Sequence, residues 1–282
     1  MVAAEGSSTL QYIQAVVFDW AGTLVDCGSC GPVQAFVESF AAHGVQVTTA
    51  EARAPMGMGK REHVAAMLAM PRIARSWERA HGEPHGEADI DRVYGLVEQS
   101  LLEIIARYAV PIPGTVEAVV AMRARGLRVG SCTGYPRPVA ERLAAAAKPF
   151  GLQPDCLVCA TDVPKSRPAP DMCREVLRRF EISDPKRAVK IGDTEQDVLE
   201  GRAAGMWTIG ITLTGSLVGL SEAELVVLPA PERDVLEREV GEVLQAAGAD
   251  FVAPDVSSCL RILEFIEEES AARPTRAPGV WG

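Results

Sequence analysis

The chain has 282 residues and a mass of 30.1 kDa, with 48% apolar and 23% charged residues. These values are typical of one large globular domain or of a core domain with a smaller insertion, and the sequence holds no apolar run of the ~18 residues that a membrane span needs. The net charge of −10 argues against a nucleic-acid partner, because such proteins usually concentrate Lys and Arg on one face.

The amino terminus and the cysteines favour a cytoplasmic protein. Residues 1–11 show neither the basic start nor the apolar stretch of a secretory signal, and seven cysteines form an odd set. Two Cys-x-x-Cys pairs, Cys27/Cys30 and Cys156/Cys159, raise the alternative of a zinc site. Cys156 and Cys159 lie in a predicted strand, where residues three apart point to opposite faces, so we interpret these cysteines as small buried residues.

The first predicted element is a strand at residues 12–18, rich in Val and Ile and followed directly by Asp19. A buried parallel strand of this kind delivers a side chain to the carboxyl edge of an open sheet, where α/β proteins place their ligands. Asp19 is therefore a candidate nucleophile.

Helical patterns alone follow this strand. The spacing of apolar residues predicts helices at residues 32–43, 62–70 and 89–108, with no strand signal between them. We interpret this stretch as a helical cap domain at residues 27–107, inserted into a core domain made of residues 1–26 and 108–282.

From residue 111 onward, helices and strands alternate, which implies βαβ units. The predicted fold class is therefore α/β, a doubly wound and mostly parallel sheet core with an inserted helical cap. The tail at 271–282, with two prolines and two glycines, is predicted to be loosely ordered. The strands are predicted at 127–131, 156–158, 188–191 and 207–211, and the helices at 115–125, 136–147, 170–180, 196–204, 232–247 and 255–268.

A second acidic cluster, Asp193 and Asp197, follows the predicted strand at 188–191. Mg²⁺ prefers oxygen ligands and usually takes one or two carboxylates together with phosphate oxygens of a substrate. We therefore expect a Mg²⁺ site made of Asp19, Asp193 and the backbone carbonyl of Ala21. The alternative is that Asp193 and Asp197 cap a helix and supply first-turn charge.

Two further residues point to a phosphoryl group. Thr133 ends a predicted strand, and its hydroxyl with nearby backbone N–H groups could hold a phosphoryl oxygen. Arg167 precedes a predicted helix as a cation suited to bidentate contact with a phosphoryl group. Each signal is weak alone, because most arginines are solvated surface residues, but both gain weight from their place among the other motifs.

The order Asp19, Thr133, Arg167, Asp193 resembles the four successive motifs of the haloacid dehalogenase superfamily. In its phosphatases the first motif is Asp-x-Asp, whose first Asp attacks phosphorus and whose second protonates the leaving oxygen. Ala21 occupies the second place and has no proton to give. The leaving group must then need no protonation by that residue, or its developing charge must be stabilised by other means.

The helical insertion offers Lys60, one of five lysines against 23 arginines, in a Gly-flanked loop before a helix. An amine whose pKa is lowered by partial burial can condense with an aldehyde to an imine, which is an electron sink for the adjacent carbon. The alternative is a solvated lysine at a helix start. His63 would share the helical face of Lys60 and could relay protons, whereas a lone histidine is more often packed.

Together these residues resemble the phosphonoacetaldehyde hydrolase family, the phosphonatase branch of that superfamily. The resemblance implies that Lys60 forms a Schiff base with the aldehyde and that Asp19 accepts the phosphoryl group. It also implies a homodimer through the cap helices, and Ser29 departs from the family pattern, in which a cysteine is usual. The marks of the resemblance are 19–23, 54–57 with Lys60 and His63, 133–135, 167–168 and 192–194, and the implied substrate-binding residues are Gly22, Met56, His63, Thr133, Tyr135 and Arg167.

The sequence thus predicts a Mg²⁺-dependent hydrolysis of the P–C bond of phosphonoacetaldehyde, a small phosphonate aldehyde. One alternative is a phosphomonoester phosphatase or a haloacid dehalogenase, but Ala21 disfavours the first and neither needs Lys60. The other is a catalytically silent protein that binds phosphorylated ligands. Intact Asp19, Lys60 and Asp193 argue against the silent protein.

Overall fold

The computed structural model describes residues 9–271, so the predicted loose tail beyond Ala271 lies outside the described residues. Within that range all strands belong to one parallel sheet with the order β3-β2-β1-β4-β5-β6. The α/β fold with a parallel sheet is thus confirmed. The strands are β1 (Ala15–Phe18), β2 (Arg128–Thr133), β3 (Cys156–Cys159), β4 (Ala188–Gly192), β5 (Trp207–Ile211) and β6 (Phe251–Ala253).

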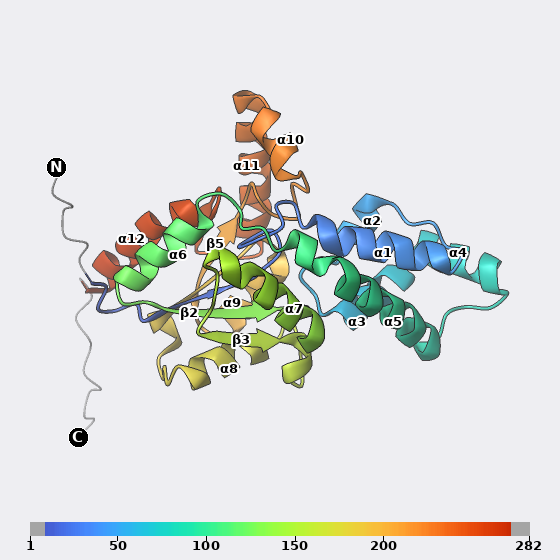
Figure 1. Ribbon diagram of the computed structural model, residues 1–282, viewed down its shortest axis with the longest axis horizontal. Helices are drawn as coiled ribbons and strands as arrows, with labels where there is room; N and C mark the ends of the chain where they lie inside the picture. The colour runs from blue at the N-terminus through green and yellow to red at the C-terminus, as the bar shows by residue number, and fades with distance from the viewer. Residues whose placement is uncertain (1–8, 272–282) are drawn as a thin grey trace, which may run out of the picture.

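Helices cover both faces of the sheet, as expected for a doubly wound fold (Figure 1). The central strand β1 is fully buried, with Val16 and Phe18 in the apolar core on one face and Ala15 and Val17 in the core on the other. The first face packs against α6 (Thr115–Ala124), α7 (Arg137–Ala147) and α12 (Cys259–Ala271), and the second against α8 (Asp171–Arg179), α9 (Glu195–Ala203) and α11 (Ala230–Ala246).

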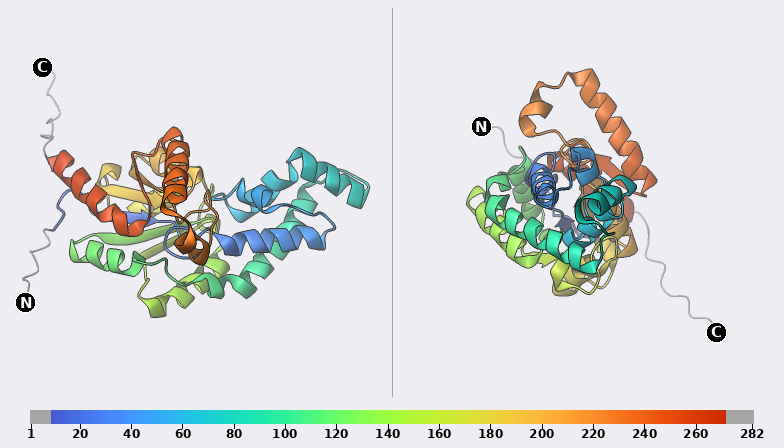
Figure 2. Two further views of the ribbon diagram at one scale, coloured as in Figure 1. Left: turned by 90° about the horizontal axis from the view of Figure 1, so that it is seen from above. Right: turned by 90° about the vertical axis from the view of Figure 1, so that its right-hand side faces the viewer.

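The stretch between β1 and β2 is helical, as predicted, and forms one end of the molecule (Figures 1 and 2). We call helices α1–α5 the helical unit. Its interior is apolar, with Phe36, Phe40 and Trp77 among its fully buried side chains. Its helices are α1 (Cys30–Ala42), α2 (Thr49–Arg53), α3 (Lys60–Leu68), α4 (Pro71–His81) and α5 (Glu87–Ile104).

Three helices and the last strand were not predicted, and α2 and α4 are two of these helices. Pro71 ends one predicted helix, but in the structure it also begins α4, because a first-turn proline lacks only an N–H that would be unpaired anyway. α10 (Glu222–Val227) and β6 have six and three residues, too few for a clear periodic pattern. The remaining elements are single 3₁₀ turns, η1 (Ile105–Tyr108), η2 (Lys148–Phe150), η3 (Ala160–Asp162), η4 (Pro185–Arg187) and η5 (Val256–Ser258).

The strand order predicts where a ligand-binding site lies on the sheet. The chain moves outward from β1 through β2 to β3 on one side and from β4 to β6 on the other, so the direction of winding reverses between β1 and β4. In open α/β sheets, ligands bind at the carboxyl ends of the strands beside such a reversal. Across residues 9–271, none of the helices combines the length and the apolar character that crossing a membrane requires.

Candidate active site

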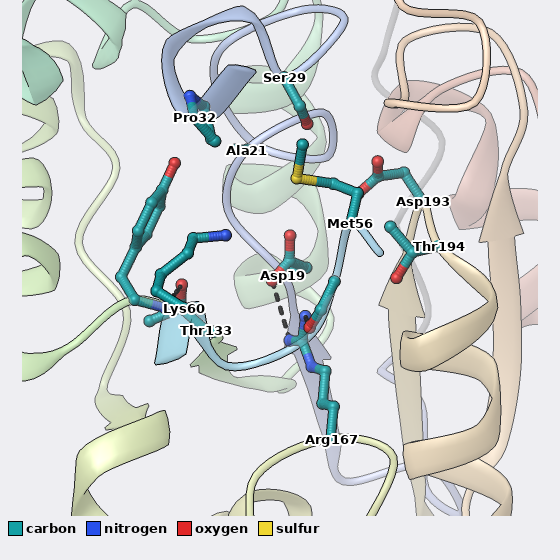
Figure 3. Close-up of a pocket in the computed structure, with 13 residues that line it drawn as sticks. Asp19, Ala21, Ser29, Pro32, Met56, Lys60, Thr133, Arg167, Asp193 and Thr194 are labelled. Carbon is teal, nitrogen blue, oxygen red and sulfur yellow. Dashed lines mark hydrogen bonds and ion pairs between the residues drawn. The ribbon is translucent and has the colours of Figure 1, made fainter. Parts of the chain in front are cut away.

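Asp19 and Lys60 meet in one small cavity between the core and the helical unit (Figure 3). Asp19 continues β1, with its N–H donating to the carbonyl of Ile191 at 2.9 Å. Most of the predicted site residues line this cavity, but Gly22 and His63 do not. The lining residues are Asp19, Ala21, Ser29, Pro32, Met56, Gly57, Lys60, Thr133, Gly134, Tyr135, Arg167, Asp193 and Thr194.

Arg167 is a buried cation held by carboxylates. Its Nη2 lies 2.8 Å from Asp19 Oδ1 and 3.0 Å from Asp197 Oδ1, and its Nε lies 2.8 Å from Glu200 Oε2. Nη2 also donates to the carbonyl of Cys132 at 3.0 Å. These partners fix the guanidinium against the predicted nucleophile. Its predicted bidentate contact with a phosphoryl group stays a prediction.

The two acidic residues after β4 have different partners. Asp197 completes a capping box with Thr194 and pairs with Lys190 Nζ at 2.7 Å, so the capping alternative describes Asp197. Asp193 instead accepts from Ser216 N–H at 2.8 Å and from the Thr23 hydroxyl at 3.1 Å. Its side chain therefore faces the carboxyl end of β1.

The donors of this cluster suit a hard divalent cation. Carboxylate oxygens of Asp19, Asp193 and Asp197 lie within 4.8 Å of one another. Burial, and then the charge of Asp19, raise the pKa of Asp193 to about 7, so two ionised carboxylates side by side need a compensating cation. Asp197 pairs with two cations, Lys190 and Arg167, whereas Asp19 pairs with Arg167 alone, through Oδ1, so Asp19 and Asp193 are the carboxylates that would hold Mg²⁺. The Ala21 carbonyl accepts no hydrogen bond among residues 9–271 and fits as a third oxygen.

Gly22 contributes by having no side chain. Its φ is +84°, and a Cβ at this position would lie 2.6 Å from Asp193 Oδ2 and 2.8 Å from Ser29 Oγ. Only glycine meets both demands without strain. Gly22 therefore lets the loop after β1 approach Asp193, although it does not line the cavity itself.

Lys60 is the first residue of α3, and Figure 3 shows its side chain reaching toward Asp19. The amine lies 4.9 Å from the centroid of the Tyr135 ring and 5.7 Å from that of Phe36. Burial lowers the pKa of Lys60 to about 8, although the charge of Asp19 opposes the shift. A buried amine near two aromatic rings contradicts the alternative of a solvated lysine.

His63 is a packed neighbour of Lys60. Its ring stacks on Phe36 with 3.8 Å between centroids, and its Nε2 donates to the Ala52 carbonyl at 2.9 Å. Burial, and then the charge of Lys60, lower the pKa of His63 well below its usual value. His63 is buried and does not line the cavity, so its predicted contact with the substrate stays a prediction.

Thr133 is the last residue of β2, and Tyr135 follows it in the next loop. The Thr133 hydroxyl oxygen accepts from the N–H of Tyr135 at 3.2 Å and keeps its own proton free to donate. The Tyr135 hydroxyl is buried and has no hydrogen-bond partner among the described residues. Both groups are therefore available to a bound molecule.

Pro32, Gly57, Gly134 and Thr194 also line the cavity. The last three belong to motifs that carry the family resemblance, but the sequence analysis assigned none of the four to the site. The two glycines mark a close contact between the core and the helical unit. A Cβ on Gly57 would lie 2.3 Å from Thr194 Oγ1, and one on Gly134 would lie 2.4 Å from the Met58 carbonyl oxygen. In the sequence, this contact could be inferred only from the two glycines themselves, because a residue without a side chain allows another segment to approach the backbone closely.

The fold and the strand-end aspartates define a haloacid dehalogenase-like hydrolase, and the family model of that description matches residues 13–205. Phosphonoacetaldehyde hydrolase from Nitratidesulfovibrio vulgaris is 44% identical over 266 residues, which cover 94% of this chain and 95% of that protein. The protein of the same name from Bacillus cytotoxicus is 41% identical over 257 residues, covering 91% and 97%. The chain belongs to the phosphonoacetaldehyde hydrolase family.

A solved structure agrees with this assignment. The crystal structure of a phosphonoacetaldehyde hydrolase-like protein from Oleispira antarctica superposes with a TM-score of 0.91 at 35% identity, and the match covers 99% of this chain and 100% of that one. The match therefore includes the helical unit as well as the sheet.

Proposed function

We propose that this protein hydrolyses the P–C bond of phosphonoacetaldehyde and yields acetaldehyde and phosphate. One observation carries the proposal: a buried amine with a lowered pKa, Lys60, shares a cavity with the carboxylate of Asp19, while Ala21 stands where a phosphatase of this class has its general acid. The names of the relatives support the same substrate.

The first step uses Lys60. Its neutral amine attacks the aldehyde carbon, and the resulting carbinolamine takes up a proton and loses water to leave a protonated imine on Nζ. The pKa of about 8 makes an appreciable fraction of the amine neutral near neutral pH. The rings of Tyr135 and Phe36 stabilise the positive charge of the imine by cation–π contact.

The second step breaks the P–C bond. A carboxylate oxygen of Asp19 attacks phosphorus, and the electron pair of the P–C bond moves into the protonated imine to form an enamine. Carbon leaves with its charge delocalised onto nitrogen, so no acid is needed at position 21. A proton then adds to the enamine carbon, and water releases acetaldehyde from Lys60 and phosphate from Asp19.

The remaining groups balance charge. Mg²⁺ bound by Asp19, Asp193 and the Ala21 carbonyl would neutralise the phosphoryl oxygens and supply Lewis-acid stabilisation. Arg167 holds Asp19 Oδ1 and adds a fixed positive charge beneath it. Thr133 offers its hydroxyl proton to a phosphoryl oxygen.

The proposal also includes the domain division, the oligomeric state and the location of the protein. These three features come from the family resemblance and from the composition of the chain. The helical unit corresponds to a cap domain at residues 27–107, the enzyme acts as a homodimer through that cap, and it works in the cytoplasm. The division at residue 27 is supported by the position of α1–α5 between β1 and β2.

Changing Ala21→Asp tests the missing acid. We expect cleavage of phosphonoacetaldehyde to fall at least about tenfold, ~1.4 kcal/mol, because a new charge lies beside the Mg²⁺ ligands and the phosphoryl group. A slight phosphomonoesterase activity is expected to appear. Phosphate release from the phosphonate and from a generic phosphomonoester, measured for parent and variant, checks both points.

Ala21→Asn is the matched control, because it adds the same bulk without the charge. It should reduce phosphonate cleavage less than Ala21→Asp and create no esterase activity. If the parent hydrolyses the ester faster than the phosphonate, a phosphatase replaces the proposed function.

The pKa of Lys60 also predicts a pH profile. The neutral amine is the reactive form, so kcat/KM for phosphonoacetaldehyde should rise with pH and reach half its maximum near pH 8. A solvated lysine would place this rise near pH ~10.4. Steady-state rates between pH 6 and 9.5 measure it, and a flat profile across that range would contradict the role of Lys60.

A further inference from the structure

Arg53, the last residue of α2, joins the helical unit to the rest of the protein. Its Nη1 donates to the carbonyl of Gly28, in the linker before α1, and to that of Ser216 at 3.4 Å. Its Nη2 donates to the carbonyl of Gly219 at 3.0 Å. Among residues 9–271, no other side chain of α1–α5 donates a hydrogen bond to the core.

The loop that accepts these bonds also holds a predicted metal ligand. The N–H of Ser216 donates to Asp193 Oδ2 at 2.8 Å, and the Thr214 hydroxyl donates to the carbonyl of Gly22 at 2.9 Å. The Thr214 carbonyl accepts from the N–H of Gly28 at 2.8 Å. Arg53 is therefore bonded to the same short loop that orients Asp193.

The reaction needs the two parts in a fixed relation, because Lys60 comes from the helical unit and Asp19 from the core. Gly57 packs closely against Thr194, and Gly134 packs closely against Met58. Packing contacts of this kind constrain the relative orientation of the two parts less than hydrogen bonds do. Arg167 adds one long hydrogen bond, 3.4 Å, to the Gly57 carbonyl. The Tyr108 hydroxyl of the core donates to Gln34 Oε1 of α1 at 2.8 Å, at an exposed position. The fork of Arg53 is the directional connection to the loop that orients Asp193, and its bond to the Gly219 carbonyl, 3.0 Å, is the shorter of its two bonds to that loop.

We propose that Arg53 is a positioning residue, which fastens the helical unit to the linker and to the loop after β5 and thereby holds Lys60 at Asp19. This inference rests on the proposed function. Arg53 lines no part of the cavity, so it acts on the reaction through Lys60.

Replacing Arg53→Ala should lower kcat for phosphonoacetaldehyde on the order of 100-fold, as expected for a misplacement of about 1 Å between reacting groups. KM should change less than about threefold, because the phosphonate is bound by Thr133, Arg167 and Mg²⁺ in the core. Arg53→Lys keeps the charge and one donor site and should restore part of the loss.

Arg72→Ala is the matched control. Arg72 is also an arginine of the helical unit, but among residues 9–271 it donates only within that unit, to Glu51 and to the carbonyl of Gln46. This variant should keep the kcat of the parent. A similar loss in both variants would show that Arg53 serves only the stability of the helices and would overturn the proposal.

Labelling gives a second readout that is independent of turnover. An amine-reactive reagent at one fixed pH, followed by peptide mapping, should modify Lys60 several-fold faster in Arg53→Ala than in the parent, relative to exposed Lys148. If Arg53→Ala fails to fold, Arg53→Lys is measured in both assays, and kcat must fall while labelling of Lys60 rises.

Two results would overturn the positioning role: kcat of the variant within about threefold of the parent, or a loss of kcat with labelling of Lys60 unchanged. Failure of the proposed function is distinct. In that case the parent releases no phosphate from phosphonoacetaldehyde, while Arg53→Ala still exposes Lys60 to the reagent.

Discussion

Lys60→Arg should abolish turnover of phosphonoacetaldehyde and leave the fold intact. The guanidinium keeps a positive charge between Tyr135 and Phe36 but cannot form an imine. Without that electron sink the carbon leaving group carries its full negative charge, so we expect kcat/KM to fall more than about 1,000-fold, ~4 kcal/mol. Phosphate release measures the loss, and circular dichroism with thermal unfolding checks the fold.

Lys148→Arg is the control, because Lys148 is exposed on the core and does not line the cavity. It should keep the activity of the parent. Borohydride with substrate should trap an adduct on Lys60 in the parent and in Lys148→Arg, and none in Lys60→Arg. Activity of Lys60→Arg within about tenfold of the parent would rule out the Schiff base.

Residues at strand ends were the most predictable part of the site. Asp19, Thr133 and Asp193 follow or end β1, β2 and β4, and parallel strands bring their carboxyl ends to one edge. A buried apolar run followed by a polar residue therefore predicts both the strand and the location of the side chain. The same rule places the loop with Ala21 at that edge.

Side chains of the helical unit were less predictable. The aldehyde chemistry of a buried lysine suggested Lys60, and the family resemblance identified its role, but no sequence pattern predicted which side of the helical unit faces Asp19. His63 is an example. Its position on the same helix as Lys60 was predicted, but the packing of its ring against Phe36 inside the helical unit was not. Arg53 gave no signal, because its acceptors are backbone carbonyls far away in the sequence.

Ion pairs between residues far apart in the chain could not be predicted from the sequence either. The contact of Arg167 with a phosphoryl group stays a prediction, but its pairing with the carboxylates of Asp19, Asp197 and Glu200 was not predicted. Spacing along the chain cannot reveal that Lys190 shares Asp197 with it. A buried charge must be paired, so such a network is expected once burial is known but not before.

Asp19→Asn should be inactive and still form the trapped adduct on Lys60. The amide keeps the shape of the carboxylate but cannot attack phosphorus, so we expect phosphate release to fall more than about 1,000-fold. Imine formation precedes that attack and needs only the neutral amine. The charge of Asp19 raises the pKa of Lys60 against the effect of burial, so its removal leaves more of the amine neutral.

Borohydride reduction in the presence of phosphonoacetaldehyde, with peptide mapping, measures the adduct, and Lys60→Arg serves as the negative control. Asp91→Asn, a change at an exposed helical residue that pairs with Arg61, should keep both turnover and adduct. A folded Asp19→Asn protein without adduct would mean that the order of steps is wrong, or that Asp19 is needed to bring the aldehyde to Lys60. Adduct without phosphate release would separate the two halves of the reaction, because the amine and the carboxylate then act on different atoms of the same substrate.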